Sequence, residues 1–221
     1  TINRPLIFSS ALFPLHTTGI SFQGLNLGKL RFGYDLMVGN GIGSTDVLDL
    51  DKGKSVTAAV HIKPRDALRI GLSYYYDRIP GGIELHSHSG GPPSVSSRLD
   101  EQLITLSVAN FGEKFELLAE STLALTKSDS TGKQNSIMSY VYLGYKLTEK
   151  VTSYVRVDNL SNYEHEHEQS SVESLGNTVA YLAGLRYQIN YLATAKLEFQ
   201  HQSTGKQPAV NIITTQFAIG F

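Results

Sequence analysis

The connections between the predicted strands constrain the fold most, because very short and long connections alternate along the whole chain. The short ones are Asn26–Gly28, Pro64–Asp66, Gly112–Lys114, Thr148–Lys150 and Asn190–Tyr191. The long ones are polar and are Gly39–Gly53, Ile79–Asp100, Lys127–Asn135, Asn159–Asn177 and Ser203–Gln207. A soluble β-sandwich gives no reason for this sorting, whereas outer-membrane barrels have tight periplasmic turns and longer outside loops. The pattern therefore predicts an all-β, transmembrane antiparallel β-barrel.

Between these connections, apolar and polar residues alternate with a period of two, which is typical of strands with one face in an apolar environment. Several segments reach about ten residues, the length of a tilted strand that crosses a bilayer. The eleven segments are Ile20–Phe22, Leu30–Val38, Val56–Lys63, Leu68–Asp77, Ile104–Val108, Phe115–Leu125, Val141–Leu147, Val151–Val157, Val179–Ile189, Ala193–Phe199 and Ile213–Phe221. No convincing helical stretch is found.

Aromatic residues fall on the apolar side of these segments, several near segment ends, as the interface girdles of a membrane barrel require. Aromatic residues also favour strands in general, so their positions alone do not show a girdle. The alternation of short and long connections supports the girdle interpretation independently. The predicted girdle residues are Tyr34, Tyr74, Tyr76, Phe115, Tyr145, Tyr187, Phe199 and Phe217.

Composition excludes several other classes of protein. The formal net charge is −1 with 18% charged residues, so no basic excess points to nucleic acid. The chain has no cysteine, which excludes disulfides, thiol nucleophiles and cysteine metal sites. No apolar run approaches the length of about 18 residues that a membrane helix needs.

Both ends of the sequence carry further expectations. Phe221 closes an alternating segment on its lipid-facing side, which resembles the C-terminal signature that the barrel-assembly machinery recognises. Counting strands back from a periplasmic Phe221 places Thr1–Pro14 on the extracellular side. Because open edges are not tolerated in lipid and bacterial barrels have even strand numbers, we expect one domain over residues 1–221 that holds at least 11–12 strands and lacks N-terminal strands.

The stretches Asn3–Phe8, Thr18–Gly24 and Leu30–Gly43, with the turn Pro64–Leu68, resemble the phosphate-selective-porin-like superfamily. The closing aromatic segment that ends at Phe221 is also similar to that family, and the resemblance is clearest over Asn3–Tyr76. It implies the C-terminal portion of a larger barrel of about 16 strands, assembled as a trimer.

The water-facing side of the segments is predicted to line the pore. It carries charges of both signs, unlike the basic constriction of the phosphate-selective members, so strong anion selection is not expected. The predicted pore-lining residues are Arg31, Asp35, His61, Lys63, Arg69, Asp77, Glu116, Glu120, Arg156, Asp158, Arg186, Lys196 and Glu198, and Lys146 lies on the same water-facing side.

The remaining motifs are interpreted as ordinary surface features and not as metal or phosphate sites. The pairs His86/His88 and His165/His167 have metal-ligand spacing, with Glu164, Glu166 and Glu168 beside the second pair, but both lie in predicted loops without a visible supporting shell. The glycines of Gly39–Gly43 precede no helix, so a turn is expected in place of a phosphate loop. No metal and no cofactor are predicted.

Catalysis is not expected, because no motif places a base beside a nucleophile, and His16, His61 and His201 stand apart from any such motif. Glu116 and Glu120 are interpreted as lumen charges. Arg156–Asn162 resembles a short piece of TonB-dependent receptors, although the plug and the usual strand number of about 22 are not evident.

The sequence thus predicts a porin of the Gram-negative outer membrane that passes small polar or ionic solutes by passive diffusion. Its expected partners are outer-membrane lipid, the solutes, the barrel-assembly machinery and two further copies of the chain. The alternative is a narrow filled barrel that serves a structural role or binds a partner through its long loops, chiefly Gly81–Pro93 and Asn159–Gly176.

Overall fold

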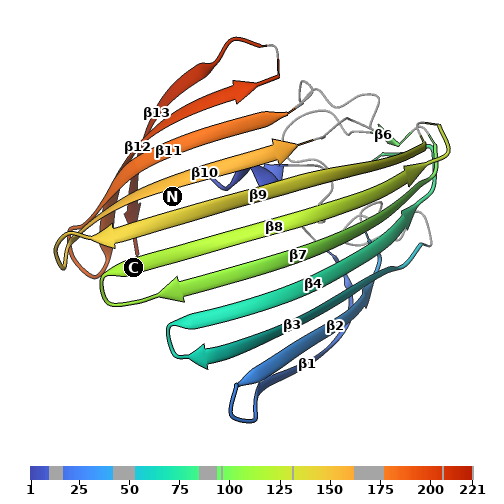
Figure 1. Cartoon of the computed structure of the whole chain (residues 1–221), viewed down its shortest axis with the longest axis horizontal. Coiled ribbons are helices and arrows are strands. Elements are labelled where there is room, and N and C mark those ends of the chain that lie inside the picture. The colour runs from blue at the N-terminus through green and yellow to red at the C-terminus, as the bar shows by residue number, and fades with distance from the viewer. Residues whose placement is uncertain are drawn as a thin grey trace.

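The computed structural model describes residues 1–9, 17–41, 53–84, 94–95, 97–130, 132–161, 177–205 and 207–220. Eleven strands form one antiparallel sheet in which every strand pairs with its neighbours in the chain, as Figure 1 shows. They are β1 (Gly19–Leu27), β2 (Phe32–Gly39), β3 (Ser55–Arg65), β4 (Leu68–Ile79), β7 (Leu99–Phe111), β8 (Phe115–Ser128), β9 (Gly132–Lys146), β10 (Val151–Ser161), β11 (Thr178–Gln188), β12 (Ala193–Thr204) and β13 (Val210–Ile219).

Two smaller elements accompany the large sheet. A separate hairpin of β5 (Ile83–Glu84) and β6 (Ser94–Val95) lies in the connection between β4 and β7. A 3-10 turn, η1, covers Leu6–Ser9. Among the described residues, no helix has the length and apolarity to span a membrane.

The sheet is strongly curved and does not close on itself. Within the described ranges, β1 and β13 are its two edges, each paired on one side only. The expected all-β antiparallel architecture and the eleven segments are confirmed.

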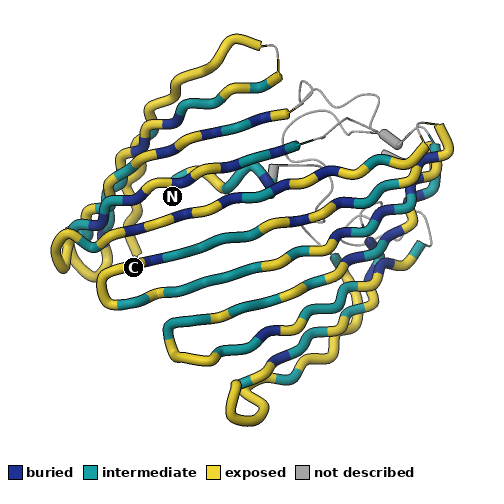
Figure 2. The backbone as a smooth tube through the Cα atoms, viewed as in Figure 1, coloured by how far each residue is buried: buried dark blue, intermediate teal, exposed yellow. Residues whose placement is uncertain are grey.

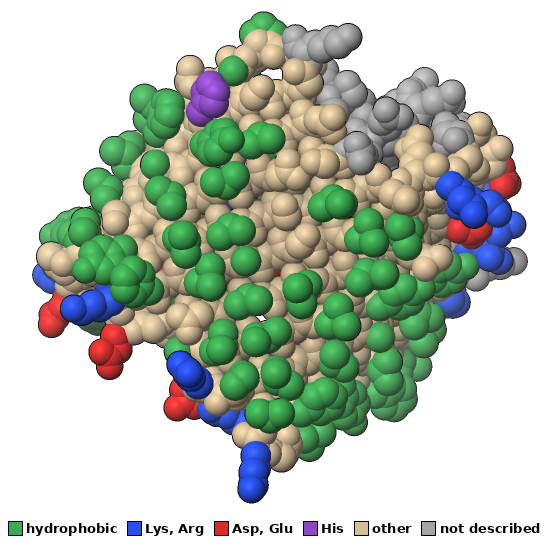
Figure 3. All heavy atoms as spheres, viewed as in Figure 1, with side chains coloured by type: hydrophobic (Ala, Val, Ile, Leu, Met, Phe, Trp, Pro, Cys, Tyr) green, Lys and Arg blue, Asp and Glu red, His purple; other side chains and the backbone are tan. Residues whose placement is uncertain are grey.

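Side chains alternate between the two faces of the sheet, as the period of two predicts. On β10, Tyr154, Arg156 and Asp158 are buried, whereas the intervening Val155 and Val157 are exposed. Figure 2 shows the same alternation along the neighbouring strands. In Figure 3, hydrophobic side chains cover the middle of the outer face, and charged side chains in view gather at the two ends of the strands. This is the distribution expected for a barrel wall in lipid.

One connection differs from its prediction. Lys127–Asn135 was expected to be a long loop, but β8 continues to Ser128 and β9 begins at Gly132. The register pairs Lys127 with Lys133 and Thr126 with Gln134, so this polar stretch is mostly strand. Pairing between strands satisfies the backbone hydrogen bonds in water as well as in lipid. The β8–β9 hairpin therefore continues, with polar side chains, beyond the part of the wall that faces lipid.

The start of the chain also differs from its predicted position. Thr1–Ser9 was expected on the extracellular side, but η1 packs on β9 and β10, and Ile7 is 1% exposed. In Figure 1 this segment lies behind β9 and β10, on the inner side of the sheet. The first residues therefore occupy the concave face, where they cover wall residues.

Candidate functional site

The predicted pore-lining residues on the strands share the inner face of the sheet. The register shows this directly, because residues that pair across an antiparallel sheet lie on the same face. One such row runs from Arg69 through Tyr142 to Arg156. Other rows contain the remaining strand residues, namely Asp35, His61, Asp77, Glu116, Glu120, Lys146, Asp158, Arg186, Lys196 and Glu198, and Lys63 follows His61 at the same parity on β3.

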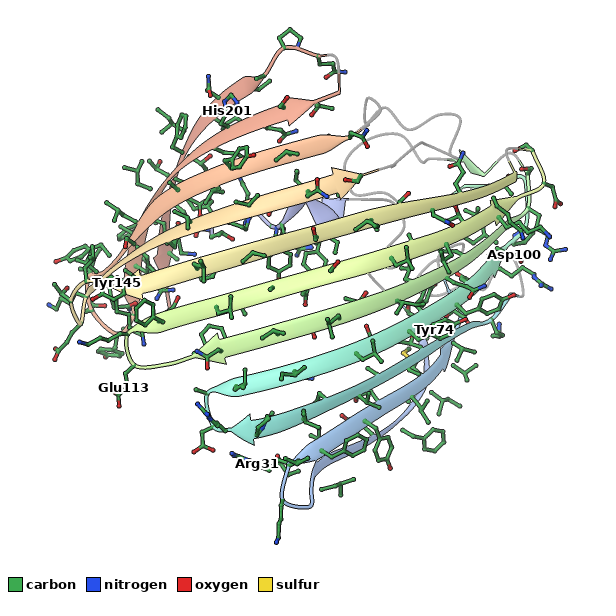
Figure 4. The ribbon with its side chains drawn as sticks, in the orientation of Figure 1. Arg31, Tyr74, Asp100, Glu113, Tyr145 and His201 are labelled. Carbon is green, nitrogen blue, oxygen red and sulfur yellow. The ribbon has the colours of Figure 1, made fainter. Side chains whose placement is uncertain are left out.

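Arg31 is the exception and is corrected here. It lies in the turn between β1 and β2 with φ 47°, outside the strands, and its guanidinium pairs with Asp66. Figure 4 labels Arg31 at the end of the sheet where β1 and β2 are joined. Arg31 has the left-handed backbone conformation of a turn residue, and it therefore lies outside the strands that form the wall.

Two tyrosines on the inner face each reach over a glycine to a glutamate, Tyr154 from β10 across β11 to β12 and Tyr142 from β9 to β8. Tyr154 donates a hydrogen bond to Glu198 at 2.6 Å, and Tyr142 donates one to Glu116 at 2.9 Å. The row Glu116, Gly144, Tyr154, Gly184 and Glu198 crosses β8 to β12 in register.

The glycines create the room for these rings. A Cβ at Gly184 would lie 2.5 Å from the Tyr154 ring, and a Cβ at Gly144 would lie 2.8 Å from the Tyr142 hydroxyl. The two rings are themselves neighbours, with centroids 5.6 Å apart. The two tyrosines and the two glutamates of this part of the wall are therefore held in place by ring packing and hydrogen bonds.

Cations neutralise two of the carboxylates on the same wall. Arg186 donates to Glu116 at 2.7 Å and to the hydroxyl of Thr152 at 3.2 Å. Arg156 Nε lies 2.9 Å from Asp158 Oδ1, with both side chains almost fully buried. Burial of a charged pair is tolerated when further hydrogen bonds satisfy its remaining groups.

The further partners of these buried charges come from the main chain of Thr1–Leu6. The Arg156 guanidinium donates to the carbonyls of Asn3 at 2.8 Å and of Arg4 at 3.4 Å. The Leu6 amide donates to Asp158 at 3.2 Å. One pair of charges on β10 thus binds both carbonyls and an amide of the segment.

A second pair on β12 binds the beginning of the segment in the same way. Lys196 donates to the carbonyl of Thr1 at 3.3 Å, and the amide of Ile2 donates to Glu198. Beyond these polar contacts, Ile7 anchors the segment in an apolar cluster of the wall. That cluster consists of Tyr75, Leu103, Ala124, Met138, Tyr140 and Leu160.

The inner face of β3 and β4 also carries charged side chains. The Arg69 guanidinium lies 3.2 Å from the imidazole of His61. Further along β4, Tyr75 donates to Asp77 at 2.8 Å. Here the inner face mixes basic, acidic and aromatic groups as it does on β10 and β12.

The sequence interpretation missed several residues of this site. Tyr75, Tyr140, Tyr142 and Tyr154 are buried on the inner face, as is Glu101. The signal was available for Tyr75, Tyr142 and Tyr154, which lie on the water-facing parity of their segments, whereas Glu101 and Tyr140 precede the predicted segments. The tyrosines were not predicted because only charged residues were assigned to the pore and aromatic residues were assigned to the lipid-facing side.

The girdle residues lie on the outer face, as their parity predicted. Phe115 and Tyr145 pair across β8 and β9 near the short turns, with ring centroids 5.0 Å apart. Tyr74, Tyr187, Phe199 and Phe217 are exposed on the same face. Figure 4 labels Tyr145 close to the turn end, the position of an interfacial aromatic.

Beside these rings, the outer face is hollowed by an apolar groove of about 700 Å³ whose lining includes Leu143, Val155, Leu185 and Phe199. Most of its lining residues belong to the apolar outer face, and Tyr154 and Glu198 of the inner face also border it. His16, His86, His88, His165, His167, Glu164, Glu166, Glu168 and Phe221 lie outside the described residues.

Comparison with solved structures finds outer-membrane proteins. A loop-deletion mutant of OmpT, an outer membrane protein of Vibrio cholerae, has a TM-score of 0.61 and 10% identity, over 90% of this chain and 62% of that chain. The CymD monoaromatic hydrocarbon channel has a TM-score of 0.44 and 10% identity, over 99% and 60%. The chain thus spans less than two thirds of each. No family model and no curated protein sequence matches it.

The apolar outer face, the charged inner face and the likeness to OmpT together define the class. The chain is a bacterial outer-membrane β-barrel protein. Its location is the bacterial outer membrane, as the sequence predicted.

The same likeness corrects one expectation, that the chain is not an enzyme. That expectation rested on the lack of a recognisable motif. The likeness to OmpT, at 10% sequence identity, shows the fold alone. One fold can carry unrelated functions, catalysis among them. The exclusion of catalysis is therefore withdrawn.

Proposed function

We propose that the chain forms the wall of an outer-membrane pore for passive diffusion of small polar or ionic solutes. The observation that carries this proposal is the charged inner face. Arg69, Lys146, Arg186, Glu116 and Glu120 all lie on that face, behind an outer face that is apolar. Charges on an inner face favour an aqueous interior, because a dry interior requires every charge to be paired.

The mixture of signs supports weak ion selectivity. A pore selects strongly when one sign of charge dominates its constriction. Here Arg186 is paired with Glu116, and Arg156 with Asp158, so neither sign dominates the wall. A general pore fits this arrangement better than a phosphate-selective one.

Membership of the phosphate-selective-porin-like superfamily is part of the same proposal, and it rests on the motifs within Asn3–Tyr76. We further propose that additional strands of the same polypeptide pair with β1 and β13, because unpaired strand edges are not stable in lipid. A total of about 16 strands would leave an aqueous channel. The intact mass of the native protein tests this, since a value near 24.2 kDa would contradict it.

A filled barrel that binds a partner through its loops is the second candidate. One observation favours it, because Thr1–Phe8 packs on the inner face and takes up part of the interior. In a wide barrel the same segment would narrow the pore without closing it.

Single-channel recording of the native protein in a planar bilayer separates the two candidates. A pore gives discrete conductance steps, with reversal potentials in a salt gradient close to zero. A strong anion preference would restore the phosphate-type pore. Folded protein that gives no conductance would contradict the pore and support the filled barrel.

A further inference from the structure

Every polar contact described between the inner wall and Thr1–Leu6 goes to the main chain of that segment. The wall donates to the carbonyls of Thr1, Asn3 and Arg4, and it accepts from the amides of Ile2 and Leu6. We infer that β10 and β12 form a binding site for the main chain of a short peptide, which Thr1–Phe8 occupies in this structure. This inference rests on the proposed pore, which gives solutes access to the wall.

The arrangement of charges explains why a peptide fits. Each strand presents one cation and one anion two residues apart on the same face, Arg156 with Asp158 and Lys196 with Glu198. A peptide offers an amide donor and a carbonyl acceptor at each ordinary residue. A solute with a single sign of charge satisfies only half of these groups.

Burial makes the site selective for a ligand that pairs fully. Arg156, Asp158 and Glu198 are at most 2% exposed when the segment is in place. Charged groups buried this deeply cost free energy unless they are paired. Glu198 Oε2 has no hydrogen-bond partner among the described residues even with the segment in place, so an occupant that also leaves Asp158 or the guanidinium without the segment's contacts would bind more weakly.

The wall also contains a place for one apolar side chain. Ile7 directly follows Leu6, whose amide binds Asp158, and Ile7 is 1% exposed among Tyr75, Met138 and Leu160. Phe8 adds a tilted ring contact to Tyr140 at a centroid distance of 6.4 Å. The ligand class is accordingly a short peptide whose main chain makes the contacts seen from Thr1 to Leu6 and which turns, as Leu6–Ser9 does, to place an apolar residue directly after them.

The segment and an added peptide must then compete for the same wall. A variant that releases the segment should bind peptide more tightly than the wild-type protein. Ile7→Asp is such a variant, because it would place a carboxylate in an apolar cluster. Thr1–Ser9 would leave the wall while β10 and β12 keep their charges.

The experiment uses the native full-length protein and its Ile7→Asp variant in a planar bilayer. The probe is the N-acetylated, C-amidated peptide Thr-Ile-Asn-Arg-Pro-Leu-Ile-Phe, which reproduces residues 1–8. The matched control peptide carries N-methyl groups on the amides of its second and sixth residues. Methylation removes the two donors to Glu198 and Asp158 and leaves every side chain in place.

We expect the unmodified peptide to block current through Ile7→Asp at a concentration about tenfold lower than the methylated one, the loss expected for charge-assisted hydrogen bonds. Wild-type protein should need more of both peptides, because its own segment competes. In the Ile7→Asp background, Arg156→Gln with Asp158→Asn should reduce the tenfold difference, because the contact of the sixth residue with Asp158 loses its charge, whereas Lys114→Gln, in the β7–β8 turn, should preserve it.

Equal block by the two peptides, or no block in a conducting Ile7→Asp channel, would overturn the inference and leave the pore standing. If Ile7→Asp fails to fold, the ratio between the two peptides in wild-type protein decides the question, since a common competitor does not alter it. Protein that folds but does not conduct contradicts the proposed pore instead. Anisotropy of a labelled peptide on detergent-solubilised protein then tests the binding site by itself.

Discussion

The hydroxyl of Tyr154 on β10 lies 2.6 Å from the carboxylate of Glu198 on β12, although the whole of β11 stands between them. Gly184 on β11 makes this possible, because any side chain there would enter the space of the tyrosine ring. The same carboxylate oxygen accepts the amide of Ile2. The position of the inner segment therefore depends on the space that Gly184 leaves on β11.

Gly184→Ala tests that dependence. The added Cβ would lie 2.5 Å from the Tyr154 ring, so the ring must move and Glu198 loses its tyrosine partner. We expect a loss of about 1–3 kcal/mol in the free energy of unfolding, as for a buried group left without its hydrogen bond. Urea unfolding in lipid vesicles measures it.

Gly220→Ala is the matched control, since its added Cβ has no neighbour closer than 3.8 Å. Equal stability changes for the two variants would show that glycine itself, and not the space under Tyr154, determines the result.

Leu72→Arg and Ser73→Arg test which face of the sheet meets lipid. Leu72 is exposed on the outer face between Val60 and Leu106, while Ser73 lies on the inner face beside Ala59 and Thr105. Arginine at position 72 should cost roughly 2–4 kcal/mol if it sits near the middle of the bilayer, and arginine at 73 should be nearly neutral. Reversible unfolding from vesicles gives both values, and the opposite order would invert the assignment of the faces.

Arg186→Gln with Lys196→Gln tests the balance of charge in the lumen. Removing two inner-wall cations leaves Glu116 and Glu198 in excess, so the pore should prefer cations. The reversal potential in a tenfold salt gradient should move toward the cation value by about 10 mV or more, out of a full span of roughly 59 mV on each side for one charge. Lys114→Gln should leave it in place, and an unchanged potential in the double variant would mean that ions do not pass this part of the wall.

Ile7→Asp tests whether the inner segment narrows the pore. Release of Thr1–Ser9 from the wall should raise single-channel conductance, because the cross-section open to ions grows. We expect an increase of about twofold, on the simple picture in which ionic current follows the open area. Tyr191→Ala, at a fully exposed turn position, is the control. A conductance equal to wild type would place the narrowest part of the pore elsewhere.

The sequence predicted the architecture well for a physical reason. A strand in a membrane barrel must alternate lipid-facing and water-facing residues, so residues such as Leu72 and Arg69 reveal their faces locally. The connection at Lys127–Asn135 was misjudged because polar residues in a strand beyond the lipid zone have the composition of a loop.

The site was predicted only in part, because its key relationships are not local. Arg156 binds Asn3 across 153 positions of sequence, and no periodicity signals such a contact. Arg31 was misplaced because alternation was extended through a turn that reverses the chain. The role of Gly184 depends on Tyr154, so it is visible only when the strands are in register.

The main-chain contacts of Thr1–Leu6 have a consequence for the history of this protein. Because the wall contacts amides and carbonyls, it does not constrain the side chains of Thr1–Pro5, and the apolar residues it requires are Leu6, Ile7 and Phe8. Among relatives, Thr1–Pro5 is therefore free to drift while Arg156, Asp158, Lys196 and Glu198 change slowly. A comparison of homologues should find a variable stretch of chain lying on an invariant surface.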